Sequence, residues 1–569
     1  GMDYQFLKSK ENTNLKKLSN SICLILSEED ALNIQNKSIY ALGIGLKSII
    51  KSISNNNYIK TVTIGVVKVT KTKNKAKIIR STNLIKRFSI KISLLIDLLD
   101  SKLNEYNINE TKDIDSDLIN SFYQKIKGDI ILEQVKDGYF SETTISQKSL
   151  LEINEDFDFF IRGSGLYIEK GEILDKYSKL GVLSLHHADN SLNRGGPVGF
   201  WEVKYKFNSG ITAQILTKEL DNGKVIYKAR LRTINNPTIN RLNIYKHTHS
   251  TLTIAISRLY NQDLIRSYID KENIIEIIQP YFREIFRMPN IIEQLRVSLG
   301  CFAKSIVIQP ERVIKKFLSL FFNPYDKWGV ALTNDTKLRV DRWTHIKTKK
   351  NKHIIENNWH ADPFIARVNN RLFLLTEKFL YRERKGVIWS HEISVSNKNI
   401  SIIRDSLLLK NSYHLSYPFT FERDGNSYMI PENNYNKCYL YKLFIKEDSN
   451  NELGVIRIRN LFNGNGIDPT LIRDKGIDYL FISSLNEKSD SILHVFFSRD
   501  IVKKEIVKHP FSPLVVDHTY GRSAGRIYKD KITEKIIRSS QINEGGYGRG
   551  IAFSELYLSP EVIVINPLK

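Results

Sequence analysis

The chain has 569 residues, which is long enough for about three domains, each with a core of its own. Its 85 Lys and Arg residues exceed its 62 Asp and Glu residues, so the formal net charge is +23. The wide spacing of Cys23, Cys301 and Cys438 excludes a disulfide scaffold and the common metal and redox motifs. No apolar run approaches a membrane span and no apolar signal core begins the chain, so we expect a reduced, cytoplasmic setting.

An N-terminal extension, residues 1–20, precedes the first predicted domain, residues 21–235. In this domain β-forming runs alternate with helical stretches such as residues 41–53, a pattern typical of a doubly wound α/β sheet. The strand-like runs are residues 21–27, 61–69, 129–135, 157–161, 181–186 and 210–216.

A candidate active-site loop follows the strand that ends at His186 and leads to a turn at Arg194. An imidazole has an unperturbed pKa of ~6.5, so His186 is suited to act as a general base. Asp221, at a later junction of strand and turn, could orient the ring, and Ser184 could donate a hydrogen bond to an oxyanion. A structural role for His186 is the alternative.

The order of these residues resembles the formyltransferase family that uses 10-formyltetrahydrofolate, whose pattern is Asn-x-His, then Arg-Gly, then an Asp before a Gly. Arg194 lies eight residues after His186, and Asp221 lies thirty-five after it. Ser184 stands where the family has asparagine, a departure at a catalytic position.

The resemblance implies formyl transfer to an amine, with catalysis by His186, Asp221 and Ser184. It also implies 10-formyltetrahydrofolate as cofactor. We expect no metal site. The cofactor would lie against the turn formed by Gly163, Ser164, Gly165 and Leu166. Residues of the loop would contact the substrate, namely His187, Asp189, Asn190 and Arg194.

Residues 236–326 are predicted to form a helical connector, because apolar residues recur there at steps of three and four. Residues 327–569 contain an internal repeat. Pro363, Pro418 and Pro469 are spaced 55 and 51 residues apart. Each belongs to a unit that consists of a proline-containing turn, a strand, a polar turn and a second strand. A period near fifty with short strands predicts propeller blades, about five of them.

The repeat region resembles the five-bladed propeller of furanosidase-type glycoside hydrolases and of the N-terminal domain of glucosamine inositolphosphorylceramide transferases. The segments 360–364, 417–419 and 429–432 carry the resemblance. We expect Asp362, Glu432 and Asp468 to face one axial cavity, with Arg526 offsetting their charge. Two readings remain open, cleavage of a glycoside by paired carboxylates and a binding pocket for a saccharide. The other lining residues would be Trp359, His360 and Tyr417.

The positive charge is spread along the chain and no nucleic-acid motif occurs, so we do not expect a nucleic-acid partner. The charge favours anionic ligands such as sugar nucleotides, or the headgroups of an inner membrane surface. The leading hypothesis is a formyltransferase-like enzyme that modifies an amino sugar in surface-glycan synthesis, with the propeller holding saccharide. The alternatives are a glycan-binding protein with a degenerate formyltransferase-like domain, and a glycan-processing enzyme whose active site lies in the propeller.

Overall fold

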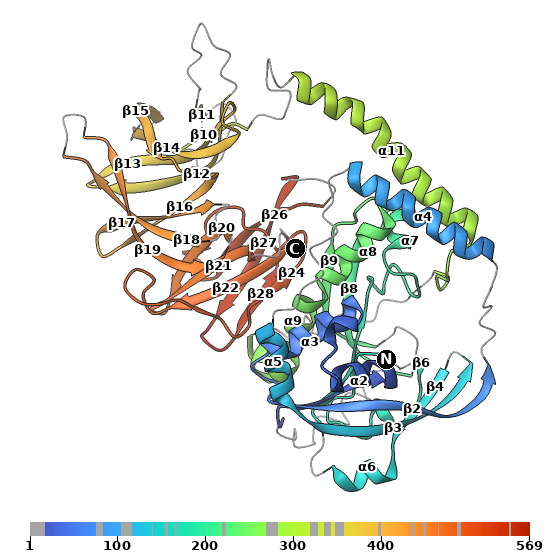
Figure 1. The fold of residues 1–569 in the computed structure, drawn as a ribbon. Coiled ribbons are helices and arrows are strands. Elements are labelled where there is room, and N and C mark those ends of the chain that lie inside the picture. The colour runs from blue at the N-terminus through green and yellow to red at the C-terminus, as the bar shows by residue number, and fades with distance from the viewer. Residues whose placement is uncertain are drawn as a thin grey trace.

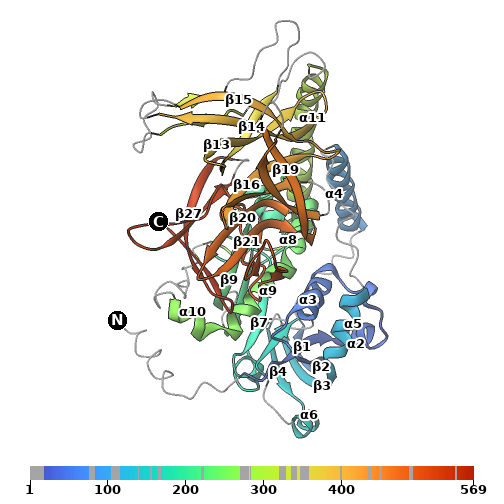
Figure 2. The same cartoon turned by 90° about the vertical axis from the view of Figure 1, so that its left-hand side faces the viewer.

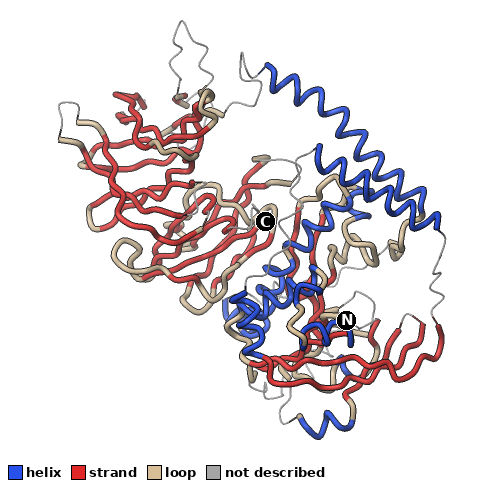
Figure 3. Tube along the Cα trace, viewed as in Figure 1, coloured by secondary structure: helices blue, strands red, loops and turns tan. Residues whose placement is uncertain are grey.

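The computed structural model has an α/β part at the N-terminal end and a set of antiparallel sheets at the C-terminal end (Figure 1, Figure 3). The structure describes residues 18–568 with the exception of 76–83, 104–115, 139, 154–156, 165–167, 219–222, 269–280, 282, 319–327, 335–342, 347–357, 397–399, 434–436, 448–450, 465, 486–490 and 545–547.

The N-terminal part is built on one nine-stranded sheet with the order β6-β4-β3-β2-β1-β5-β7-β8-β9. Its centre is parallel, from β3 to β7, and the order reverses on the two sides of β1, as the doubly wound pattern predicts. Strands β8 and β9 extend it antiparallel. The bounds are β1 Ser21–Ser27, β2 Thr61–Lys75, β3 Ile126–Gly138, β4 Phe140–Ile145, β5 Phe159–Arg162, β6 Ile168–Glu169, β7 Val182–His186, β8 Ser209–Ile215 and β9 Lys224–Leu231.

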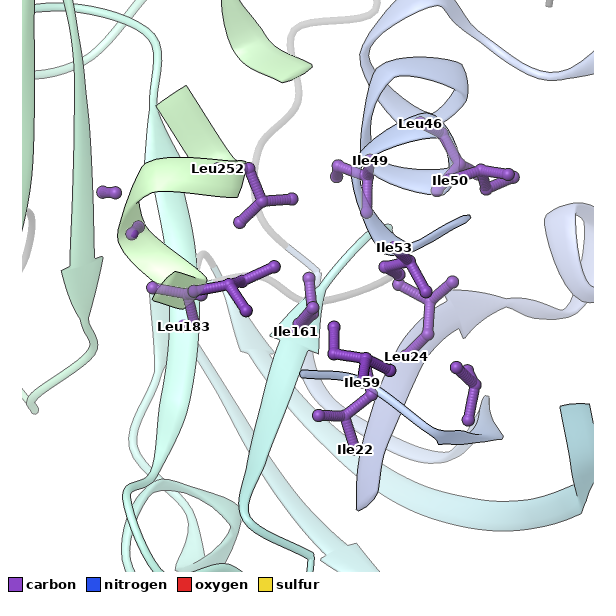
Figure 4. Close-up of a cluster of buried hydrophobic side chains, with 14 of the residues drawn as sticks. Ile22, Leu24, Leu46, Ile49, Ile50, Ile53, Ile59, Ile161, Leu183 and Leu252 are labelled. Atoms are coloured by element: carbon purple, nitrogen blue, oxygen red, sulfur yellow. The ribbon is translucent and has the colours of Figure 1, made fainter. Parts of the chain in front are cut away.

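The two faces of this sheet are covered differently. Side chains alternate along a strand, so Ile22 and Leu24 of β1 face the helices while Cys23 and Ile25 face the other way. Figure 4 shows the first face, where Leu46, Ile49, Ile50 and Ile53 of one helix pack on the strands. On the second face, the described residues include a 3-10 turn and loops but no long helix, unlike the helices on both faces expected of a doubly wound sheet. The covering elements are α2 Glu28–Gln35, α3 Ile44–Asn55, α5 Ser116–Lys125 and α9 Thr248–Tyr260 on the first face, and α6 Gln147–Glu152 and η3 Glu172–Leu174 near the second.

The helices in residues 236–326 pack on the parts that flank them in the sequence. Helix α8 (Pro237–Lys246) begins where the Asn236 side chain accepts a hydrogen bond from Ile239 N, with Pro237 in the first turn. It continues into α9, and both contribute to the core of the N-terminal part. Helix α10 (Gln262–Tyr268) adds Ile265 to a core of the C-terminal part. Helix α11 (Ile291–Leu318) packs along α4 (Leu84–Leu103), as Figures 1 and 2 show.

The C-terminal part consists of blade-like antiparallel meanders, which agrees with the predicted propeller architecture. Four of the meanders have four principal strands each, and the pair β10-β11 supplies a smaller fifth unit in the described residues. The bounds are β10 Ala331–Leu332, β11 Thr344–His345, β12 Trp359–Val368, β13 Arg371–Leu380, β14 Lys385–Val395, β15 Ile400–Leu409, β16 Leu415–Arg423, β17 Asn426–Asn433, β18 Lys437–Ile445, β19 Leu453–Asn463, β20 Gly466–Asp474, β21 Ile477–Leu485, β22 Ile492–Ser498, β23 Val507–Lys508, β24 Val515–Val516, β25 Tyr528–Lys529, β26 Ile536–Ile542, β27 Gly550–Leu558 and β28 Ile563–Pro567.

The first hairpin of three successive blades closes with a two-residue turn in which both residues have positive φ. These turns are Asn369-Asn370, Asp424-Gly425 and Lys475-Gly476. Turns of this kind match the twist of the strands and favour Asn, Asp and Gly. The spacing of the turns repeats the spacing of the prolines, so the same local chemistry builds each blade.

The two parts of the chain share one hydrophobic core. Ile492 and Val516 of the C-terminal sheets pack in the same buried cluster as the N-terminal helices and strands. Arg230 Nε donates to Asp517 Oδ2 at 2.7 Å across this contact. We therefore regard the interface as part of the fold.

Candidate functional site

Equivalent positions at the start of the inner strands adopt an uncommon backbone conformation. Asp362, Tyr417 and Asp468 have φ of 49°, 44° and 48°, and each precedes a proline. A register shift interrupts the pairing of the strand at the same place in all three blades. The left-handed region is strained for residues other than glycine, and such strain often marks a functional site.

The second strand of each blade places another polar residue beside this bulge. Glu377 pairs with Ala361, Glu432 with Ser416, and Ser483 with Ile467. Each lies fifteen residues after the residue with positive φ in its own blade. The rotational repeat thus brings Asp362, Glu377, Glu432 and Asp468 together; these four residues are called the axial carboxylates below.

Hydrogen bonds connect the axial carboxylates across blades. Asp468 N donates to Glu432 Oε2 at 3.0 Å, and Tyr417 N donates to Asp362 Oδ2 at 3.3 Å. Arg522 Nε donates to Asp468 Oδ2 at 2.5 Å, and Gln541 Nε2 donates to the same oxygen at 3.3 Å. The cation beside the cluster is therefore Arg522.

The electrostatics of the cluster favour the retention of protons. Burial, and then the charge of Asp468, raises the pKa of Asp362 to about 6. Burial, and then the charge and hydrogen bond of Asp362, raises the pKa of Glu377 to about 9. Burial also raises the pKa of Glu432 well above its ordinary value, with Asp468 adding to the effect. Like charges in a low-dielectric site cannot all ionise together.

Access to solvent divides the cluster into two kinds of group. Asp362 and Glu432 are partly exposed, whereas Glu377 and Asp468 are buried. A bound molecule could therefore contact Asp362 and Glu432, while Glu377 and Asp468 act through them.

The other residues predicted to line the axial pocket have contacts that differ from the predicted ones. Arg526 was expected to offset the carboxylates, but it donates to Ile365 O and Thr420 Oγ1 and lies over the Phe364 and Phe419 rings. Arg526 lies four residues after Arg522 in the sequence.

The aromatic and imidazole side chains serve the packing of the blades. Tyr417 is only 3% exposed and its hydroxyl is hydrogen-bonded to Thr470 Oγ1, so its ring has no face open to a sugar. His360 is hydrogen-bonded to Thr376, and burial lowers its pKa to about 3, so it is neutral. Trp359 is half-buried and stacks on Phe379 with ring centroids 4.9 Å apart.

The structure tests the predicted formyltransferase-like site only in part, because Asp221, Gly165 and Leu166 lie outside the described residues. His186 Nε2 donates to the Asn193 carbonyl at 2.8 Å. Ser184, on the same face of β7 by strand alternation, is buried. Formyl transfer by His186, Asp221 and Ser184 stays a prediction.

The rest of the predicted loop is held by internal contacts. Asp189 forms an ion pair with Lys228 at 3.1 Å, and Asn190 donates to Gln214 Oε1. Arg194 Nε donates to Asn190 O and lies over the Tyr281 ring. His187 is hydrogen-bonded to Thr248, and burial lowers its pKa to about 3.

The turn predicted to hold the cofactor packs against the end of β1. Ser164 Oγ donates to Asp30 Oδ2 at 2.6 Å, and Ser27 N donates to Ser164 Oγ. A Cβ on Gly163 would lie 2.8 Å from Ile25 O, so the backbone approach there requires glycine.

Within the described part of the chain, no three His, Cys, Asp or Glu side chains are grouped as metal ligands. None of the described helices has both the length and the hydropathy to cross a membrane.

Residues 325–559 match the family described as glucosamine inositolphosphorylceramide transferase 1, N-terminal. The match covers less than half of the chain and coincides with the blades that carry the axial carboxylates. No curated protein matches the chain in sequence.

Solved glycoside-acting enzymes resemble part of the chain. A thermostable family-43 glycoside hydrolase is 13% identical over 36% of this chain and 74% of its own, with a TM-score of 0.29. An exo-1,5-α-L-arabinanase from a bovine ruminal metagenomic library is 11% identical over 42% and 89%, with a TM-score of 0.28. An exo-β-1,3-galactanase from Phanerochaete chrysosporium is 11% identical over 40% and 54%, with a TM-score of 0.30, so this chain spans about half of its length. Likeness at this level carries no information about activity.

Proposed function

We propose that the protein is a carbohydrate-active enzyme whose active site is formed by the axial carboxylates. The supporting observation is that two partly exposed carboxyl groups, Asp362 and Glu432, both lie beside Asp468 and have different surroundings. The family match of residues 325–559 supports a saccharide ligand, because the family is named for a glucosamine transferase.

The chemistry follows from the protonation of the two groups. With a pKa of about 6, Asp362 is mostly ionised at pH 7 and can act as a base or a nucleophile. The raised pKa of Glu432 keeps its proton available for a leaving oxygen. One ionised and one protonated carboxyl group are the pair that most glycosidases use to cleave a glycosidic bond.

The buried members of the cluster position this pair. Glu377 is hydrogen-bonded to Asp362, and the charges of Asp468 and Arg522 act on both carboxyl groups. Asp468 donates its backbone N–H to Glu432 and is itself held by Arg522. These contacts fix both partly exposed carboxyl groups by neighbours on other strands, as a preorganised site needs.

The test uses the full chain with a panel of nitrophenyl glycosides of pentoses and hexoses, together with nucleotide-activated sugars. We expect release of nitrophenol or transfer of sugar by the wild type, and a loss of about 100-fold or more in Asp362→Asn and Glu432→Gln, since a positioned acid or base contributes ~10²- to 10⁴-fold. Glu447→Gln, at an exposed position in the same part of the chain, is the matched control. Wild-type turnover in both axial variants would reject the proposal.

A binding assay separates catalysis from recognition alone. If the wild type binds a glycan on an array without turning it over, and Asp362→Asn weakens that binding, the site recognises saccharide and the catalytic assignment is wrong. If neither variant changes binding or turnover, the axial carboxylates are not the site.

A further inference from the structure

Helix α11 exposes a row of apolar side chains to solvent. Ile292, Leu299 and Ile306 are spaced at seven residues, as are Val307 and Ile314, so they lie along one side of the helix. Val307 is 74% exposed and Ile292 is 69% exposed. A surface helix of a globular protein normally turns such a stripe toward the core.

The opposite side of α11 is small and polar and is buried. Ser298, Cys301 and Ser305 lie there. The neighbouring helix α4 shows the same inversion: it buries Asp97 and Asp100 and exposes Leu94, Leu95 and Leu99.

Hydrogen bonds from residues at the start of α8 hold the buried polar groups of α4. Thr238 Oγ1 donates to Asp97 Oδ2 at 2.7 Å, and Asn236 Nδ2 donates to Asp100 Oδ2 at 2.8 Å. Because these bonds fix the polar side of α4 inward, its leucines cannot turn into the core without leaving two buried carboxyl groups unpaired. The outward apolar face is therefore built into the fold.

Cations flank the apolar face. A cavity of about 480 Å³ lies between α11 and α7 (Phe200–Tyr205), and its lining includes Lys204, Arg296 and Lys304. Ile292 of the apolar row lines the same cavity, so apolar and cationic groups meet at its edge. Lys204 is paired with Glu293, while Arg296 and Lys304 lie on the exposed side of α11.

We propose that the face formed by α4 and α11 binds the surface of an anionic membrane, with apolar side chains in the acyl boundary and lipid phosphates beside Arg296 and Lys304. Helices with one apolar side and flanking Lys or Arg lie in the plane of the interface and bind anionic lipid. In Figure 1 α4 and α11 lie side by side at the edge of the molecule, where a flat surface can reach them.

Charge favours a lipid surface over a second copy of the chain. A symmetric pairing of this face would bring Arg296 and Lys304 of one copy toward the same residues of the other, or would gather them at the edge of the interface. In both arrangements like charges of the two copies would repel each other. Anionic headgroups neutralise them instead.

The test is cosedimentation of the full chain with vesicles of phosphatidylcholine, alone or mixed with phosphatidylserine. We expect binding to the mixed vesicles only, weakened by salt. The variant with Leu299→Glu and Val307→Glu should lose at least about tenfold in partition coefficient, and Arg296→Gln and Lys304→Gln about fivefold each. Leu151→Glu, which changes an 88% exposed leucine on α6, should bind as the wild type does.

Other outcomes would overturn the proposal. They are absence of wild-type binding to the mixed vesicles, equal binding to neutral vesicles, or equal binding by the variants. A dimer in light scattering that Leu299→Glu with Val307→Glu dissociates, with no vesicle binding, would assign the face to self-association. Melting curves identify any variant that fails to fold, and the two glutamine variants, which change only exposed side chains, then decide the result.

Discussion

Arg522 Nε lies 2.5 Å from Asp468 Oδ2, and this ion pair joins two blades at the centre of the C-terminal sheets. Asp468 is 2% exposed, so its charge depends on Arg522 and on the donor Gln541 for compensation. Asp468 also donates its backbone N–H to Glu432. The pair therefore supports both the stability of the sheets and the geometry of the axial carboxylates.

Removal of the arginine should be costly. We expect Arg522→Met to lower the free energy of unfolding by about 3–5 kcal/mol, because it leaves a buried carboxylate without its partner. Urea denaturation at pH 7 measures the loss. The double variant Arg522→Met with Asp468→Asn should recover part of it, and Arg526→Met should cost less, since Arg526 contacts a carbonyl and a hydroxyl. Equal losses of unfolding free energy in Arg522→Met and Arg526→Met would contradict the assignment of Arg522 as the partner of Asp468.

The protonation of Glu377 should make stability depend on pH. Its folded pKa is about 9 against an ordinary value near 4.5, so the folded state binds more protons than the unfolded state between these values. Stability is then fully present below about pH 4.5 and falls as the pH rises toward 9. We expect the melting temperature to fall over this window in the wild type and to fall less in Glu377→Gln.

Melting curves at pH 5, 7 and 9 measure this effect, with Glu447→Gln as the control because that carboxylate is exposed. At pH 9 the Glu377→Gln variant should be more stable than the wild type by at least about 1 kcal/mol, given that one unit of pKa shift corresponds to ~1.4 kcal/mol. Parallel curves for the wild type and Glu377→Gln would show that Glu377 is ionised in the fold.

The sequence was sufficient to predict the blades, because the prolines after Asp362, Tyr417 and Asp468 mark a conformation that recurs in three of the units. It also named three of the axial carboxylates. It missed Glu377, although the spacing of fifteen residues from Asp362 repeats between Tyr417 and Glu432. A comparison of second strands, and not only of strand starts, would have found it.

Other features depend on tertiary contacts that no local pattern encodes. The choice of Arg522 over Arg526 depends on which of the two side chains reaches Asp468. The burial of Tyr417 depends on Phe364 from another blade, with ring centroids 4.8 Å apart. The periodicity of α11 predicts a helix but cannot tell which side faces the core, and there the buried side is the polar one.

Gly386 should be required for the position of Glu377. A Cβ there would lie 2.6 Å from Glu377 Oε1 and 2.4 Å from Leu415 O, and backbone cannot yield cheaply. We expect Gly386→Ala to destabilise the protein by about 1–3 kcal/mol and to reduce the pH dependence that Glu377 produces. Denaturation at pH 5 and pH 9 measures both. Gly128→Ala, where nothing lies within 4 Å of the added Cβ, is the control and should leave the pH dependence unchanged.

Tyr227 should couple the two parts of the chain. Val516 N donates to the Tyr227 hydroxyl at 2.6 Å, and both residues lie in the core that the two parts share. Tyr227→Phe keeps the ring but leaves a buried N–H without its acceptor, which costs about 1–3 kcal/mol. In calorimetry, the N-terminal and C-terminal parts should unfold in one transition, because one core contains residues of both. Tyr227→Phe should lower the melting temperature of that transition. Tyr205→Phe, at a 45% exposed position, should change little. A transition that splits in the wild type, with only one component shifted by Tyr227→Phe, would show that the parts unfold independently.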